Sequence, residues 1–143
     1  MVGLGANIHA LEIYNQSMLA LACKKGALEA LTYLIEQGLD IHQGCDFERQ
    51  PLHYAAEFGH VDLMELLLVL GVDINALSDE NETPILDAAE YGKHEAVQFL
   101  LDHGANWQIR DDSGRNAYDM SILRKRPTVQ AVFHAFIKEN APA

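Results

Sequence analysis

Apolar and polar residues are spaced along this chain as in short amphipathic helices. Within residues 61–70, apolar side chains recur at intervals of three and four positions, which predicts a helix with a broad apolar face. A second apolar segment, residues 52–58, precedes it, and Pro51 stands where the first turn of a helix tolerates a missing N–H group. Gly59 and Gly71 follow the two segments as the expected left-handed terminators. This part of the chain is therefore predicted to be a pair of helices.

The same pattern recurs along the chain every 33 residues, which is the spacing between Gly26 and Gly59. Glycines, small residues and apolar pairs keep one phase: Gly26, Gly59 and Gly92; Gly5, Gly38, Gly71 and Gly104; Ala22, Ala55, Ala88 and Ser121; Leu34-Ile35, Leu67-Leu68 and Leu100-Leu101. A fixed period of roughly 20–50 residues is typical of a solenoid, in which each unit buries its apolar face by stacking on its neighbours. We predict one all-α domain over residues 1–143, with a remnant at 1–11 and repeats at about 12–44, 45–77, 78–110 and 111–140.

The units resemble the ankyrin repeat. Residues 83–89 (Thr-Pro-Ile-Leu-Asp-Ala-Ala) are similar to the family's Thr-Pro-Leu-His-x-Ala-Ala signature, and residues 50–56 match it apart from Gln50. Residues 71–76 and 102–106 are similar to later segments of the consensus. The resemblance implies a slightly curved solenoid of stacked helix-turn-helix units with projecting β-turn fingers. It also implies protein binding through the fingers and inner helices, without catalysis.

The two ends depart from the pattern. Residues 5–10 are in phase with the closing segment of a repeat whose helices are absent. Either the chain is cut from a longer ankyrin protein, which we favour, or the remnant itself covers the first repeat. In the fourth unit Lys125 replaces the glycine, and a last helix follows with an apolar face formed by Val129, Val132, Phe133, Phe136 and Ile137. We interpret this unit as a C-terminal cap, because terminal repeats need a polar outer face.

The acidic excess lies in the middle of the chain. The net charge is -11, and the segment from Asp46 to Asp102 holds thirteen acidic residues against Arg49 and Lys93, which leaves eight residues of each sign elsewhere. Such a field repels nucleic acid phosphate and attracts basic protein surfaces. A merely soluble, charged surface is the alternative. We expect a protein partner with a basic and apolar surface, and no nucleic acid.

No segment predicts a membrane or secretory role. The chain has no run of 18 or more apolar residues, so no membrane span is expected. The first residues lack a basic segment followed by an apolar core, so no signal peptide is expected either. We expect a cytoplasmic protein that is a monomer on its own, although a signal removed before this numbering would leave no trace.

The geometry of the family selects candidate residues for partner binding. They stand, by phase, on the fingers and at the ends of the first helices: Tyr14, Lys24, Lys25, Asp46, Phe47, Arg49, Glu57, Phe58, Asp79, Glu80, Glu82, Glu90, Tyr91, Asp112, Arg115 and Arg124. The four aromatic residues of this set are candidate anchors, because a few large side chains carry most of an interface's binding energy. Packing of each aromatic residue against its own finger is the alternative.

The histidines, cysteines and acids do not form a catalytic pattern. The resemblance gives His53 the role of the signature histidine, which hydrogen-bonds the neighbouring turn. Cys23 replaces an alanine of a first helix and is expected to be buried, whereas Cys45 begins a finger. Asp87 and Glu90 are interpreted as a solvated helix face, and the chain contains no H-E-x-x-H or C-x-x-C motif. We predict no enzyme activity, metal or cofactor; a spacer segment of a larger ankyrin protein is the alternative to partner binding.

Overall fold

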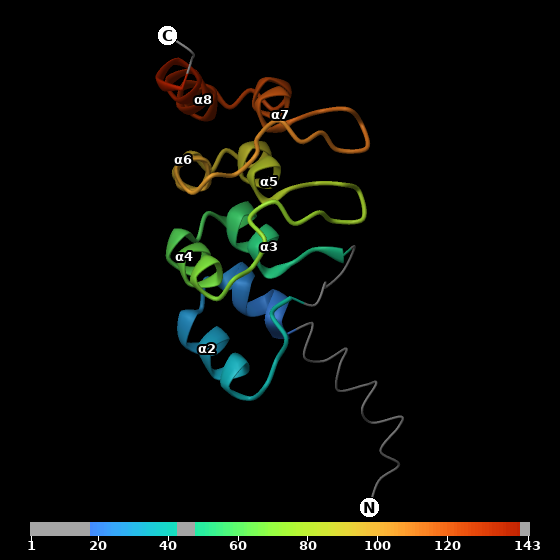
Figure 1. Cartoon of the computed structure of the whole chain (residues 1–143), viewed down its shortest axis with the longest axis vertical. Helices are drawn as coiled ribbons and strands as arrows, with labels where there is room; N and C mark the ends of the chain where they lie inside the picture. Colours follow the sequence, from blue (N-terminus) through green and yellow to red (C-terminus); the bar gives the residue numbers. More distant parts are fainter. Residues whose placement is uncertain (1–17, 43–47, 141–143) are drawn as a thin grey trace, which may run out of the picture.

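The computed structural model describes residues 18–42 and 48–140, and these residues form a stack of helix pairs (Figure 1). The first helices of the pairs lie in one row, the second helices lie in a row beside it, and long loops project from the opposite side of the first row. No strand occurs in the described residues, which confirms the predicted all-α solenoid. The helical segments are residues 18–25, α2 (Leu28–Glu36), α3 (Pro51–Phe58), α4 (Val61–Val69), α5 (Pro84–Glu90), α6 (His94–Asp102), α7 (Ala117–Leu123) and α8 (Pro127–Glu139).

The core is one continuous apolar layer along the stack. The first helices α3, α5 and α7 contact one another through small residues such as Ala55 and Ala88, which are fully buried. The second helices insert larger side chains, among them Leu67 and Leu100, which are also fully buried. Since each repeat buries its apolar residues against the next, the period of the sequence becomes the period of the core.

Local signals in the sequence explain where the helices begin and end. Thr83 caps α5 by accepting a hydrogen bond from the Leu86 backbone N–H at 3.3 Å. Gly59 ends α3 in the left-handed conformation, with φ of 73°. Lys125, which replaces the glycine in the fourth unit, keeps the same backbone conformation with φ of 55°. The fourth unit therefore retains the repeat's backbone turn at the cost of some steric strain.

Neighbouring repeats are joined by cationic or imidazole side chains that reach back to the end of the preceding first helix. The His60 Nε2 atom lies 2.7 Å from the Lys24 carbonyl oxygen, and the Arg126 Nε–H donates to the Glu90 carbonyl oxygen at 3.0 Å. Lys93 occupies the corresponding place against Gly59, where an added Cβ would lie 3.1 Å from its Cδ. The imidazole of His60 and the guanidinium of Arg126 thus satisfy carbonyl groups at the negative end of a helix.

His53 fixes the third finger to the second repeat. Its Nδ1 accepts a hydrogen bond from the Gln50 backbone N–H at 2.9 Å, so its Nε2–H donates to the Glu82 carbonyl oxygen at 2.8 Å. This confirms the bond to the neighbouring turn that the resemblance implied. Burial lowers the pKa of His53 to about 4. The ring is therefore neutral at physiological pH, as the Nδ1 acceptor role requires.

The last repeat closes the stack with an aromatic cluster. Phe133 is fully buried, and its ring centroid lies 5.7 Å from that of Trp107 and 5.8 Å from that of Tyr118. The Tyr118 hydroxyl also forms a 2.7 Å hydrogen bond with Nε2 of His134. This packing joins the fourth unit to the third, and the role of the fourth unit as a C-terminal cap stays a prediction.

At the other end of the stack, the remnant at 1–11 lies outside the described residues. An apolar cavity of about 480 Å³ there is bounded by Met18, Leu21, Tyr33 and Leu34, among others. No described helix covers this cavity beyond the first repeat. Among the described residues, no helix combines the length and the apolar character that crossing a bilayer requires.

Candidate functional site

The third and fourth fingers are two hydrogen-bonded loops that lie side by side (Figure 1). The third finger is closed by the Ser78 N–H, which donates to the Glu82 carbonyl oxygen at 3.0 Å. The two fingers are joined by the Asp112 N–H, which donates to the Glu80 carbonyl oxygen at 3.1 Å, and by the Asn81 amide, which donates to the Asp112 carboxylate at 2.6 Å. The fingers and the ends of the first helices together form one surface, which we call the inner groove.

The candidate binding residues that the structure describes are either exposed or half-buried in the inner groove. Exposed members of the set are Lys24, Lys25, Phe58, Asp79, Glu80, Tyr91, Asp112, Arg115 and Arg124, and half-buried members are Arg49, Glu57, Glu82 and Glu90. Tyr14, Asp46 and Phe47 lie outside the described residues. The two described aromatic anchors, Phe58 and Tyr91, are 43% and 46% exposed, so their side chains are not consumed by the core.

Arg49 binds inside the groove instead of projecting from its finger. Its guanidinium lies 2.9 Å from the Glu57 carboxylate, 3.1 Å from the Asp87 carboxylate and 3.5 Å from the Glu82 carboxylate. The guanidinium also lies 5.0 Å from the centre of the Tyr54 ring, which is a cation–π distance. We call Arg49, Glu57, Glu82 and Asp87 the Arg49 cluster. Its three carboxylates face one guanidinium, so the cluster has an excess of negative charge.

Asp87 contradicts the sequence-based interpretation of a solvated acidic face. It is 1% exposed, because it stands on the inner face of α5, where Arg49 and Glu82 cover it. Its contact with Arg49 is an ion pair without hydrogen-bond geometry, and neither carboxyl oxygen has a hydrogen-bond partner among the described residues. Burial raises the pKa of Asp87 well above its ordinary value of 3.8; Arg49 opposes this increase and Glu82 adds to it. Burial also raises the pKa of Glu82 above 4.5.

A signal for the burial of Asp87 was present in the repeat phase. The equivalent positions of the other repeats hold Leu21, Tyr54 and Met120, which are apolar or aromatic. Tyr54 and Met120 are buried as well. An aspartate by itself predicts a solvent-exposed side chain, whereas its position in the repeat predicts a side chain on the inner face of the stack. The burial of Asp87 agrees with its position in the repeat.

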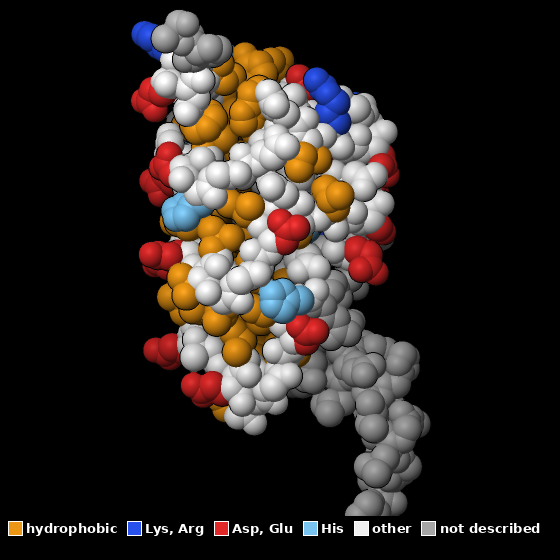
Figure 2. Space-filling model, in the orientation of Figure 1, with side chains coloured by type: hydrophobic (Ala, Val, Ile, Leu, Met, Phe, Trp, Pro, Cys, Tyr) orange, Lys and Arg blue, Asp and Glu red, His pale blue; other side chains and the backbone are white. Residues whose placement is uncertain are grey.

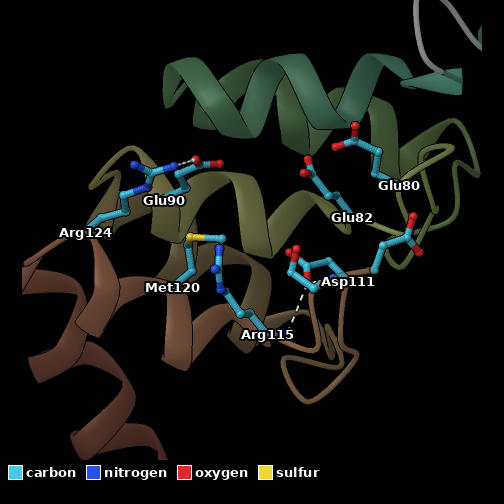
Figure 3. A pocket seen from close by; sticks show the side chains of 9 residues that line it. Glu80, Glu82, Glu90, Asp111, Arg115, Met120 and Arg124 are labelled. Atoms are coloured by element: carbon cyan, nitrogen blue, oxygen red, sulfur yellow. Dashed lines mark hydrogen bonds and ion pairs between the residues drawn. The ribbon is translucent and has the colours of Figure 1, made fainter.

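A cavity of about 280 Å³ opens beside the cluster, between the third and fourth fingers (Figure 3). We call it the acidic cavity; it is lined by Glu80, Glu82, Glu90, Asp111, Asp112, Ser113, Arg115, Met120 and Arg124. Figure 3 shows Glu80 and Glu82 on one side, with the Arg115 side chain reaching from the fourth finger toward Met120. The Arg124 guanidinium is neutralised by Glu90 at 2.8 Å. Six of the predicted binding residues thus meet at one cavity.

Acidic side chains are not restricted to the inner groove. In Figure 2 they follow both edges of the stack, that of the fingers and that of the second helices. What distinguishes the groove is the burial of its acids and their convergence on Arg49. Within residues 18–42 and 48–140, no three His, Cys, Asp or Glu side chains are placed to hold a metal ion, and Cys23 is fully buried.

Comparison with protein families identifies the repeats. A family model described as ankyrin repeats (3 copies) matches residues 2–77, which is more than half of the chain. A second model, described as ankyrin repeats (many copies), matches residues 71–121. A search of the curated proteins found no match.

Proposed function

Because the chain belongs to the ankyrin-repeat family, we propose that it binds a partner protein through the inner groove and catalyses no reaction itself. Ankyrin repeats are generally protein–protein interaction modules and are typically non-catalytic. The observation that carries the proposal is the pair of large aromatic side chains, Phe58 and Tyr91, which stand one repeat apart at the ends of α3 and α5. Both are more than 40% exposed, and the stack does not need them for its core.

Phe58 and Tyr91 have the properties of binding anchors. A Phe or Tyr side chain buries roughly 150–250 Å² when it is covered, and it loses little conformational entropy because it has only two rotatable bonds. Carboxylates lie close to Tyr91, since Glu57 and Glu90 both act on its pKa, whereas Phe58 stacks on the His60 ring with centroids 6.4 Å apart. A partner with an apolar patch flanked by basic residues would complement this surface. A contact of standard size would bury about 800 Å² on each protein.

The charge along the groove gives the interaction a direction. Lys24 and Lys25 lie toward the N-terminal end, the acids of the second and third repeats lie in the middle, and Arg115 and Arg124 lie toward the C-terminal end. A partner's basic residues therefore meet attraction at the centre of the groove and repulsion at its N-terminal end, beside Lys24 and Lys25. Such complementarity raises the association rate and sets the register of the bound partner, more than it adds affinity.

Site-specific photo-crosslinking tests the proposal. One variant carries benzoylphenylalanine at position 91, in the groove, and a matched control carries it at position 69, where Val69 is 79% exposed on α4 away from the fingers. After irradiation in native extract, position 91 should crosslink one protein stoichiometrically and position 69 should crosslink none. Equal labelling from both positions, or none from either, would favour a spacer segment over a binding module.

The captured protein then allows a quantitative test of the anchors. The double variant Phe58→Ala/Tyr91→Ala should bind the purified partner at least 100-fold more weakly, with only a small decrease in the unfolding midpoint, because the two side chains are 43% and 46% exposed. Val69→Ala should bind as the parent chain does. Undiminished binding by the double variant would remove Phe58 and Tyr91 from the binding surface.

A further inference from the structure

The Arg49 cluster sets three carboxylates against one guanidinium, so the cation is shared among three acids. Glu57, Glu82 and Asp87 all lie within 3.5 Å of one guanidinium, and the side chains of Glu57 and Glu82 are only 20% exposed. Asp87 is almost completely buried, and neither of its carboxyl oxygens has a hydrogen-bond partner among the described residues. Buried carboxylates without compensating charge are strongly unfavourable. Such a group in a native protein needs an explanation, for example a binding partner that compensates its charge.

Among the described residues, the groups that surround Asp87 offer no second cation. Arg49 contacts it directly, Tyr54 and Glu57 contact Arg49, and Glu82 faces it from the third finger. Tyr91, on Asp87's own helix, lies close enough for its pKa to be raised, mainly by burial and then by Glu57, Glu90 and Asp87. The side of α7 toward α5 presents the uncharged Met120, and α6 buries only Ala96, Val97, Leu100 and Leu101.

The chain itself shows that a guanidinium fits between two neighbouring repeats of this groove. Arg49, Glu82 and Arg115 occupy the same position in three successive repeats. Between the second and third repeats, Arg49 reaches forward to Glu82 and Asp87 of the next unit. Between the third and fourth repeats the equivalent residue is Glu82, an acid that pairs backward with Arg49. The space that an arginine fills in one interval is therefore open in the next, as the acidic cavity.

The acidic cavity can admit a long cationic side chain up to Glu82. Its volume of about 280 Å³ is many times the roughly 10–15 Å³ that a single water needs. Five carboxylates and two guanidinium groups line it, and Glu90 neutralises the guanidinium of Arg124. Glu80 is exposed, and its carboxylate has no ion-pair partner among the described residues. Among the described residues that line the cavity, Arg115 is the one cationic side chain without an ion-pair partner, so it is the one that repels a cationic guest.

We propose that the partner inserts one lysine or arginine side chain into the acidic cavity, where its charge pairs with Glu80 and with Glu82, the member of the Arg49 cluster that lines the cavity. This inference rests on the proposed function, because it names the chemistry by which the partner is recognised. Charge-assisted hydrogen bonds to a carboxylate pair are among the strongest polar contacts available to a protein. The guest places a second cation beside Glu82 and leaves the anchors Phe58 and Tyr91 free to hold its apolar neighbours.

The test uses a small probe that has the charge but not the rest of a partner. N-acetyl-arginine amide is titrated into the full chain at low ionic strength, and N-acetyl-citrulline amide serves as an uncharged probe of the same shape. Two-dimensional NMR should show saturable shifts for the arginine probe at the backbone amides of residues 80–83 and 87–91. The citrulline probe should give no saturable shift there.

Matched variants assign the site. Glu80→Gln should weaken the arginine probe at least 3-fold without affecting folding, because the Glu80 side chain is exposed. Arg115→Gln should tighten it about 3-fold, since Arg115 lines the cavity and repels the guest. Glu65→Gln, which removes an exposed acid from α4, should leave the affinity unchanged.

Three results would overturn the inference: no saturable shift with the arginine probe, equal binding of the citrulline probe, or equal weakening by Glu65→Gln and Glu80→Gln. A further arm with the crosslinked partner separates this inference from the proposed function. If Phe58→Ala/Tyr91→Ala abolishes partner binding but Glu80→Gln does not change it, the groove binds a protein and the cationic pocket is wrong.

Discussion

Replacing Asp87 by leucine should make the protein more stable, although it removes an ion-pair partner of Arg49. The substitution places an apolar side chain where the first and fourth repeats hold Leu21 and Met120. Arg49 keeps its contacts with Glu57 at 2.9 Å and Glu82 at 3.5 Å, so no cation is left unpaired. The variant therefore removes a buried acid without leaving an uncompensated charge.

The size of the gain follows from the burial of the site. Asp87 is 1% exposed, and complete burial of a leucine side chain contributes about 1.5–3 kcal/mol. Leucine is larger than aspartate, and local overpacking offsets about 1 kcal/mol of this gain. Removing the desolvated carboxylate adds a further increment. The expected net increase in the free energy of unfolding at pH 7 is about 2 kcal/mol.

The gain should depend on pH. Because the pKa of Asp87 is raised in the fold, the native state binds a proton more tightly than the unfolded state does. The stability that this carboxyl contributes is present below its unfolded pKa of about 3.8 and is lost as the pH rises through its folded pKa. Leucine does not titrate, so Asp87→Leu should gain more at pH 7 than at pH 4.

Urea unfolding followed by far-UV circular dichroism measures both quantities. Arg49→Met is the matched counterpart and should lower the free energy of unfolding by about 3 kcal/mol, because it leaves three carboxylates without their cation. The reasoning is refuted if Asp87→Leu destabilises the chain by more than about 1 kcal/mol at pH 7. It is refuted equally by a gain that is the same at pH 4 and pH 7.

Three further predictions concern the fold. The pKa of His53 falls from 6.5 to about 4 on folding, so its contribution to the free energy of unfolding is complete above pH 6.5 and is lost toward pH 4. Acidification from pH 7 to pH 4 should therefore lower the free energy of unfolding by about 3 kcal/mol through this residue, and an NMR titration of the ring checks the pKa. Lys125→Gly should raise the free energy of unfolding by about 0.5–1 kcal/mol because φ is 55° there, whereas Lys138→Gly inside α8 should lower it by about 1 kcal/mol. Phe133→Ala should lower the free energy of unfolding by about 3–5 kcal/mol, as measured by urea unfolding, because Phe133 is fully buried. Ile137→Ala should lower it by less than about 1.5 kcal/mol, because Ile137 is 40% exposed.

Periodicity made most of the fold predictable, because every repeat reuses the same packing. Gly59 and Gly71 end helices in the second unit as their phase required, and both have positive φ. The positive φ at the turns of the fingers was not predicted: Glu48, Asn81 and Gly114, which are equivalent positions of successive repeats, all have positive φ. Asparagine and glycine are typical of that conformation, but glutamate is not, so Glu48 hid the series.

The site was predictable in its position and not in its contacts. Repeat phase correctly indicated that Phe58 and Tyr91 lie outside the core, and their role as anchors stays a prediction. Arg49 was expected at a fingertip, yet two of its three partners, Glu82 and Asp87, belong to the next repeat. Which carboxylates a long side chain reaches depends on its rotamer and on the stacking of two repeats. A one-dimensional pattern does not contain that information.

Asp87 is where local residue preference and global packing disagree most in the described part of the chain. Leu21, Tyr54 and Met120 show that the repeat accepts an apolar or aromatic side chain at this position, so the fold does not require a carboxylate there. A single compensating cation, Arg49, is shared among three acids, and the compensation is therefore incomplete. Proteins break such local rules mainly where function benefits, and they lose stability in doing so. The stability gained by Asp87→Leu should consequently measure what the chain loses by keeping a carboxylate at this position.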